Sequence, residues 1–191
     1  MSMFTLAVFV RIMNPSVLHD KLFTEGVENN MRKLKLYFDT TVVSYLYQND
    51  SPEKMAETLA LWEKIKLGNY DVCLSEVTIA EANACYEPKR TKLFEYIDEI
   101  EYTLIETDKN IVDIAQKFID LKILTPKSID DCRHIASAIA GGCDIIVSWN
   151  FRHIVNHKTI KGVKAITALE GFNDVLIYTP SYLLGGDDND S

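Results

Sequence analysis

Three acidic residues stand at positions in the chain where carboxylates can do chemistry. Asp39 directly follows the apolar run at residues 36–38, Glu81 follows a second apolar run, and Asp131 lies near the start of a largely apolar segment. In open α/β sheets, ligand sites form outside the carboxyl ends of strands, so an acid that ends a strand is informative. Clustered carboxylates repel one another unless protons, basic side chains or a divalent cation neutralise them. The three acids are therefore candidates for a cation site.

Each acid also has a purely structural interpretation. Asp39 can cap the helix that follows it, Glu81 can be an ordinary surface glutamate, and the dipole of its helix favours a negative charge at Asp131. Asp130 is a spare carboxylate beside Asp131, and an exposed N-cap is its simplest interpretation. The functional prediction therefore depends on the combined arrangement of the acids.

The segments around these acids alternate short apolar runs with longer stretches of helical spacing. This alternation is typical of a parallel sheet covered by helices and predicts an α/β fold. We expect strands at residues 34–38, 70–74, 103–105, 145–148 and 175–178. We expect helices at residues 51–68, 77–85, 89–100, 108–121 and 128–140. In the second of these helices, Val77, Ala80 and Ala84 are expected on the buried face, with Glu81 near its edge.

Length and composition favour a single domain with additions at both ends. The chain has 191 residues, of which 47% are hydrophobic and 25% charged, an ordinary globular balance. We expect a domain at residues 31–184, an N-terminal appendage at 1–30 and an acidic tail at 185–191. Residues 1–30 lack sustained periodicity. Met31 can serve as an alternative start, and an extra helix packed on the domain is an equally good interpretation of the appendage.

Charge and apolar content limit the classes of function and location. The formal net charge of -8 argues against a surface that holds a nucleic-acid backbone non-specifically, so any such contact must be local. No apolar run approaches the roughly 18 to 20 residues that span a bilayer. The four cysteines form no C-x-x-C pair, so reduced and partly buried thiols are expected. We expect a cytoplasmic protein without membrane association.

Four segments together resemble the PIN-domain family, which includes VapC-like toxin ribonucleases. Residues 39–41 are similar to the family's first-acid motif, 75–81 to the segment that supplies the second acid, 131–138 to its third-acid helix, and 146–150 to its final strand and loop. The resemblance runs from about Leu34 through Pro180. Each segment is short and degenerate. The match rests on their order and on spacings of 42, 50 and 19 residues between Asp39, Glu81, Asp131 and Asn150.

The resemblance implies a three-layer α/β/α fold with a central, mostly parallel sheet and metal-dependent cleavage of RNA phosphodiester bonds. Asp39, Glu81 and Asp131 would then be catalytic and would bind Mg²⁺ or Mn²⁺, which prefer oxygen ligands. Asp39 would be the central ligand, and Glu81 a ligand or an orienter of the attacking water. The resemblance also implies an RNA substrate, a homodimer and, for the toxin of a type II toxin-antitoxin pair, an antitoxin partner.

One position departs from the family pattern. Many members place another acid near the end of the last core strand, where this chain has Asn150, with His153 three residues later. Asn150 stays in the predicted catalytic set because its side-chain oxygen can contact a metal-bound water. The missing acid keeps open a second interpretation, a PIN-like module that binds RNA or protein without cutting it. A phosphatase of the haloacid dehalogenase kind is disfavoured, because Thr41 stands where that enzyme needs a second Asp.

Side chains near the acids are expected to contact the RNA substrate: Thr41, Arg133, Arg152 and His153. Solvated surfaces or ion pairs with the abundant acids explain each basic residue equally well. Trp149 and Phe151 flank Asn150 and can stack on a base, although core packing is the simpler interpretation. His134 is expected to form a structural hydrogen bond, since Mg²⁺ disfavours imidazole.

Overall fold

The computed structural model describes residues 32–185, and the unit that they form begins at Lys33. The predicted appendage at residues 1–30 and nearly all of the predicted acidic tail lie outside the described residues. The domain boundaries therefore stay predictions. No helix within residues 32–185 is both long enough and apolar enough to cross a membrane.

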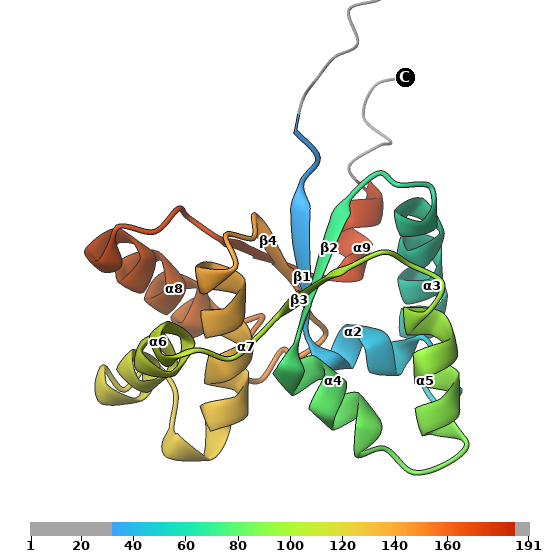
Figure 1. Cartoon of the computed structure of the whole chain (residues 1–191), viewed down its shortest axis with the longest axis horizontal. Helices are drawn as coiled ribbons and strands as arrows, with labels where there is room; N and C mark the ends of the chain where they lie inside the picture. Colours follow the sequence, from blue (N-terminus) through green and yellow to red (C-terminus); the bar gives the residue numbers. More distant parts are fainter. Residues whose placement is uncertain (1–31, 186–191) are drawn as a thin grey trace, which may run out of the picture. The chain divides into compact units, whose positions relative to one another are not determined.

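Five parallel strands form one sheet in the order β3-β2-β1-β4-β5 (Figure 1). The strands are β1 (Lys35–Phe38), β2 (Asp71–Ser75), β3 (Thr103–Ile105), β4 (Ile145–Val147) and β5 (Leu176–Tyr178). β1 occupies the centre and pairs with β2 on one side and β4 on the other. Both faces of β1 and β4 are buried, as expected for strands in a covered parallel sheet. The predicted α/β class and parallel sheet are confirmed.

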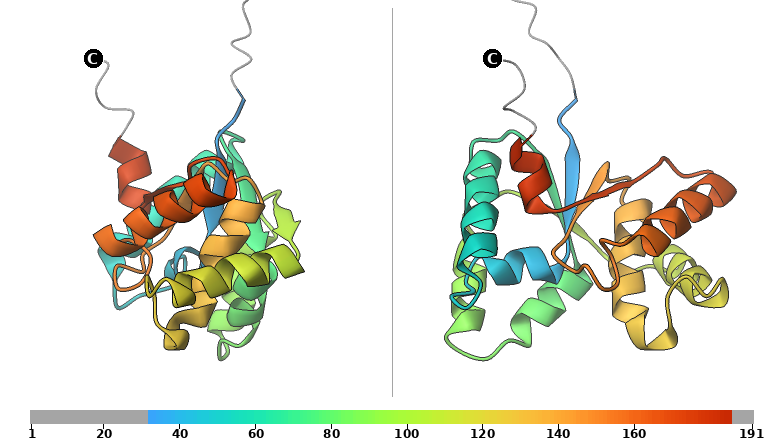
Figure 2. Two further views of the ribbon diagram at one scale, coloured as in Figure 1. Left: turned by 90° about the vertical axis from the view of Figure 1, so that its left-hand side faces the viewer. Right: turned by 180° about the vertical axis from the view of Figure 1, so that it is seen from behind.

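Helices cover both faces of the sheet, which makes three layers (Figures 1 and 2). On one side lie α6 (Lys109–Asp120), α7 (Ile129–Ala140) and α8 (His157–Glu170). On the other side lie α2 (Thr40–Tyr45), α3 (Pro52–Lys66), α5 (Lys89–Ile97) and α9 (Pro180–Leu184). α4 (Glu76–Asn83) continues from β2, and a 3-10 turn at Pro126–Ser128 precedes α7.

Alternation along the strands divides the core into two layers. Tyr37 and Ile146 pack in the layer that contains α6, α7 and α8, whereas Leu36, Phe38 and Val147 pack in the layer that contains α2, α3 and α5. This alternation is the period-two pattern of a strand buried on both faces. The three-layer α/β/α architecture implied by the family resemblance is therefore confirmed.

Side chains at the strand ends and in the loops begin several of the helices. In each case a side-chain oxygen accepts a backbone N–H of the first helical turn, which satisfies a donor that has no partner within the helix. The capping residues are Asp39, Ser75, Asp108, Asn156 and Thr179. The cap predicted at Asp108 is confirmed. Asp39 directly follows β1 and Ser75 is the last residue of β2, so each connects the end of a strand to the start of a helix.

The sequence prediction missed α8 and α9. α8 has an interior Gly162 and an exposed Leu169, which blur the apolar stripe by which helices are recognised. Gly162 is needed because α8 approaches Ile123 closely; a Cβ at this position would lie 2.5 Å from Ile123 Cγ2. Pro180 ends the predicted last strand, but it also occupies the first turn of α9, a position that proline tolerates well.

The buried face of α4 differs from the predicted one. Thr78 and Ala82 are buried, whereas Ala80 and Ala84 are exposed and Val77 is half-buried. A polar threonine can face the core here because its hydroxyl donates to the carbonyl oxygen of Phe38 at 3.1 Å. The three predicted core positions instead line an open pocket beside Glu81.

The cysteines agree with the sequence prediction. All four are free thiols, and Cys73, Cys132 and Cys143 are buried. Burial raises the pKa of Cys132 to about 12, which keeps this thiol protonated at neutral pH.

Gly162→Ala should destabilise the protein by about 1–3 kcal/mol, because the added methyl group would collide with Ile123. Urea unfolding of the variant, of Ile123→Ala and of the double variant measures this effect and its origin. The cost of Gly162→Ala should be smaller in the Ile123→Ala background, since the colliding atoms are then absent. An equal cost in both backgrounds would contradict the close approach of α8.

Candidate active site

The predicted acids lie near the carboxyl ends of the central strands, at the place where the strand order reverses. From β1 the chain adds β2 and then β3 on one side, and it returns to place β4 and β5 on the other side. The reversal therefore falls between β1 and β4. Asp39 follows β1 and Ser148 follows β4. A reversal of this kind opens a crevice at the carboxyl edge of a parallel sheet, the usual place for a ligand site.

Asp39 is held from three directions and is almost completely buried, with 2% of its surface exposed. Ser148 Oγ donates to its Oδ2 at 2.6 Å, while Thr41 Oγ1 and the backbone N–H of Val42 donate to its Oδ1 at 2.6 and 3.3 Å. Burial raises the pKa of Asp39 above its usual range, although His134 and these hydrogen bonds oppose the shift. Asp39 therefore caps α2 and is also a desolvated carboxylate at the crevice.

Asn150 connects the end of β4 with Asp131. Its backbone N–H donates to Ser148 Oγ at 2.9 Å, and its side-chain Nδ2 donates to Asp131 Oδ1 at 2.7 Å. The sequence predicts the Asn150 oxygen on a metal-bound water, but in the structure it accepts the backbone N–H of His153 at 3.0 Å. Asn150 thus orients Asp131 and closes the loop after β4, so a continuous chain of hydrogen bonds joins Asp39 to Asp131.

His134 and Tyr37 hold Glu81. His134 Nε2 lies 3.1 Å from Glu81 Oε2, and the Tyr37 hydroxyl lies 2.7 Å from His134 Nδ1. Thr40 also donates its hydroxyl to Glu81 Oε2. Burial raises the pKa of Tyr37, so the phenol keeps its proton. With a neutral imidazole, the consistent assignment has Tyr37 donating to Nδ1 and Nε2–H donating to Glu81. The structural hydrogen bond predicted for His134 is confirmed.

The three acids differ in their electrostatic environments. Burial raises the pKa of Asp131, and the charge of Glu81 adds to this effect, while His153 and His134 oppose it. Burial also acts to raise the pKa of Glu81, but hydrogen bonds from His134 and Thr40 outweigh it, so the pKa is lowered. Within the described part of the chain, none of the three carboxylates forms an ion pair with lysine or arginine.

Carboxylate oxygens of this kind are the ligands that hard divalent cations prefer. Residues 32–185 contain no group of three or more His, Cys, Asp or Glu side chains close enough to hold a metal ion by themselves. The donor chemistry of Asp39, Glu81 and Asp131 suits Mg²⁺ or Mn²⁺, but the three carboxylates are not gathered closely enough to hold an ion without further ligands.

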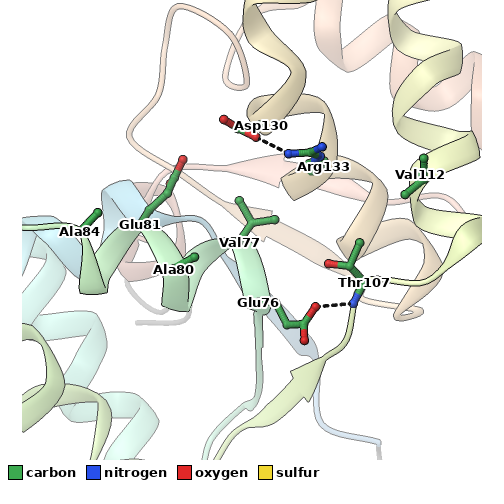
Figure 3. Close-up of a pocket in the computed structure, with 9 residues that line it drawn as sticks. All are labelled: Glu76, Val77, Ala80, Glu81, Ala84, Thr107, Val112, Asp130 and Arg133. Atoms are coloured by element: carbon green, nitrogen blue, oxygen red, sulfur yellow. Dashed lines mark hydrogen bonds and ion pairs between the residues drawn. The ribbon is translucent and has the colours of Figure 1, made fainter.

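An open pocket of about 430 Å³ adjoins Glu81 (Figure 3). Arg133, predicted to contact RNA, reaches back along α7 in this pocket and donates to Asp130 at 2.9 Å. Glu76, on the opposite side, accepts the backbone N–H of Thr107 at 2.9 Å. The pocket thus carries three acids and one arginine, and that arginine is already paired with one of the acids.

The other predicted RNA contacts are placed differently. The Thr41 hydroxyl donates to Asp39 and accepts the backbone N–H of Trp149 at 2.8 Å, so both of its hydrogen-bonding functions serve the site's framework. Arg152 and His153 line a separate pocket beyond the loop after β4. Trp149 is buried and its indole N–H donates to Thr58 at 2.9 Å, whereas Phe151 is half exposed.

Sequence reasoning missed the two residues that tie the site together, Ser148 and Tyr37. Ser148 directly follows β4 just as Asp39 follows β1, and two polar residues that end neighbouring parallel strands are a signal that the sequence does contain. Tyr37 gave no comparable signal, because a tyrosine inside an apolar strand is usually part of the core.

Comparisons with known proteins show what the chain is similar to. A family model for the PIN domain matches residues 36–154, a range that includes all four predicted catalytic residues. No curated protein sequence matches the chain. The solved structures that resemble it include VapBC2 from Rickettsia felis bound to a DNA fragment from its promoter. That structure has a TM-score of 0.49 and 14% identity, and the match covers 76% of this chain and 98% of the other.

Asp39→Asn should raise the thermal stability of the protein in neutral buffer containing EDTA. Because the folded-state pKa of Asp39 is raised, the folded state binds this proton more tightly than the unfolded state, and stability falls as the pH rises above the ordinary Asp value of 3.8. The amide cannot ionise, and its oxygen can still accept from Thr41 and Val42.

Thermal unfolding followed by circular dichroism from neutral pH down to about pH 4 measures this effect. The advantage of Asp39→Asn over wild type should shrink as the pH falls, and the exposed control Asp130→Asn should show no such advantage. A variant that is less stable than wild type at neutral pH would show that burial does not govern the ionisation of Asp39.

Proposed function

Because the chain belongs to the PIN-domain family, we propose that it is a metal-dependent endoribonuclease that hydrolyses RNA phosphodiester bonds. One observation carries the proposal. Hydrogen bonds through Ser148 and Asn150 join Asp39 to Asp131, and the charge of Glu81 acts on Asp131. None of the three acids pairs with a lysine or arginine among the described residues. Carboxylates that share a site in this way need a positive charge, which a divalent cation and its waters can supply.

Mg²⁺ or Mn²⁺ is the cofactor in this proposal. Asp39, Glu81 and Asp131 would hold it, in part through water molecules, which Mg²⁺ retains readily. When bound, the ion would supply an activated water and a positive charge that neutralises the scissile phosphate. Asp39 suits the role of central ligand because three donors fix its position. Glu81, whose side chain is 42% exposed, is open enough to orient the attacking water.

The remaining polar residues of the site act through these three acids. Asn150 would position Asp131 through its amide, His134 would position Glu81 through its ring, and Thr41 would position Asp39 through its hydroxyl. Asn150 is thus a positioning residue in this proposal, although the sequence predicts it in the catalytic set. A chain of hydrogen bonds that restrains each carboxylate limits the movement of the ligands during the reaction.

The central test is cleavage of a mixed panel of structured and single-stranded RNAs in Mn²⁺, Mg²⁺ or EDTA. Wild type should cleave only with a divalent ion, and Asp39→Asn and Asp131→Asn should each lower the rate by at least about 100-fold. Asp130→Asn is the matched control, because Asp130 neighbours Asp131 but pairs with Arg133 on the surface. Its rate should stay within about threefold of wild type.

Two results would contradict the ribonuclease. Cleavage that persists in EDTA would show that the reaction needs no divalent ion, and cleavage that persists in both Asn variants would show that Asp39 and Asp131 are not required for it. RNA binding without cleavage, unchanged by chelator, would instead support the binding module that the absence of a fourth acid leaves open. Thermal unfolding of each variant distinguishes a lost activity from a lost fold.

The proposal extends to a toxin-antitoxin pair and a homodimer, on the basis of the resemblance to VapC-like ribonucleases. The three carboxylates would receive an arginine or lysine of a small antitoxin, since a guanidinium binds carboxylates in a bidentate fashion. An antitoxin that inhibits wild type should bind the Asp39→Asn/Asp131→Asn double variant at least about tenfold more weakly. Equal affinity would place the partner elsewhere, and a monomer in light scattering would overturn the homodimer.

A further inference from the structure

A small pocket beside the loop after β4 differs in its charge from the pocket beside Glu81. This basic pocket has a cavity volume of about 190 Å³ and is lined by Arg152, His153 and Lys158 together with uncharged residues. No acidic residue is part of its lining. The chain as a whole carries a net charge of -8, so three basic side chains around one cavity without an acid are an exception that needs an explanation.

The basic pocket is directly connected to the acidic site. The backbone N–H of His153 donates to Asn150 Oδ1, and Asn150 in turn donates to Asp131. In addition, His153 Nδ1 lies 3.4 Å from the hydroxyl of Ser128, which precedes the helix that carries Asp131. The loop after β4 therefore contributes residues both to the acidic site and to the basic pocket.

The charges of the basic pocket are available to a ligand. Arg152 and Lys158 are both exposed, and neither forms an ion pair within residues 32–185. By contrast, Arg133 in the larger pocket beside Glu81 is already paired with Asp130. Asn156, the N-cap of the 14-residue α8, and Thr159 in its first turn also line the basic pocket, so the positive end of that helix adds to the same field.

The chemistry of the lining favours a phosphate group. A guanidinium offers paired donors to phosphate oxygens, an ammonium group adds a compact positive charge, and hydroxyl groups of Thr125 and Ser128 complete the set. A negatively charged strand crossing the acidic site would be repelled by the three acids of the pocket beside Glu81, and it would be attracted towards the basic pocket.

We propose that the basic pocket binds a backbone phosphate of the RNA strand on one side of the scissile bond. This inference rests on the proposed ribonuclease function. It also predicts the path of the bound RNA strand, which would pass from the acidic site over the loop at Asn150 towards α8. A contact of this type positions the substrate and carries no sequence information. It would also supply a local cationic contact beside the acidic site of a chain whose net charge is -8.

The test is the salt dependence of binding of a fluorescently labelled single-stranded RNA to full-length Asp39→Asn protein, measured in EDTA and in Mn²⁺. Arg152→Gln and Lys158→Gln are introduced separately and together. Lys161→Gln is the matched control, because Lys161 is exposed on the same helix but does not line the basic pocket.

The double variant should raise the Kd by about tenfold and lower the slope of log K against log salt by about 0.7, the value for one phosphate contact of a single strand. Lys161→Gln should leave the slope unchanged. Because both pocket side chains are exposed, these variants are expected to fold, and their thermal unfolding should match that of the Asp39→Asn parent protein.

Three other outcomes would overturn the proposed phosphate contact, and a fourth would overturn the ribonuclease alone. An equal effect of Lys161→Gln would show a diffuse positive field rather than a site. Loss of inorganic phosphate binding in the double variant, with RNA binding unchanged, would assign the pocket to free phosphate. If wild type cleaves RNA but the salt slope is unchanged in all variants, the proposed phosphate contact is wrong and the proposed ribonuclease stands. If wild type cleaves no RNA but the slope changes in the double variant, the pocket binds RNA phosphate and the proposed ribonuclease is wrong.

Discussion

The hydrogen bond from Ser148 Oγ to Asp39 Oδ2 crosses the point where the strand order reverses, and much of the site depends on it. Asp39 ends β1 and Ser148 follows β4, so the bond joins two segments that lie 109 residues apart in the chain. Ser148 also accepts the backbone N–H of Asn150, whose amide then reaches Asp131. A buried carboxylate is costly without hydrogen bonds, which explains why so many neighbouring groups are directed at this one acid.

A second connection fixes Glu81 from inside the fold. Tyr37 lies on β1 immediately before Phe38, but its side chain enters the opposite core layer and contacts His134 there. His134 is on α7, three residues after Asp131, so the same helix carries one acid and holds another through its ring. The carboxylates therefore receive their positions from the sheet and from α7 together, which suits the metal-dependent site that we propose.

The fold class, the five strands and the position of Asp39 at a strand end could be predicted because they depend on local patterns. Strands appear as short apolar runs, and an acid after such a run lies at the carboxyl edge of a parallel sheet. The family resemblance that these patterns supported is confirmed by the matching family model. Long-range packing could not be predicted. Gly162 interrupts the helical sequence pattern of α8, but it is there because α8 packs closely against Ile123. Thr78 is buried because the carbonyl oxygen of Phe38, distant in sequence, accepts its hydroxyl.

The distribution of charge reconciles an acidic protein with the nucleic-acid substrate that we propose for it. Repulsion from the acids on both sides of Glu81 and a net charge of -8 would weaken RNA binding anywhere on a uniform surface. The basic residues near the site differ in whether they form ion pairs. Arg133 is paired with Asp130, whereas Arg152 and Lys158 have no acidic partner among the described residues. An RNA strand would then have one favourable way through the site, and the loop between β4 and α8 would set its direction.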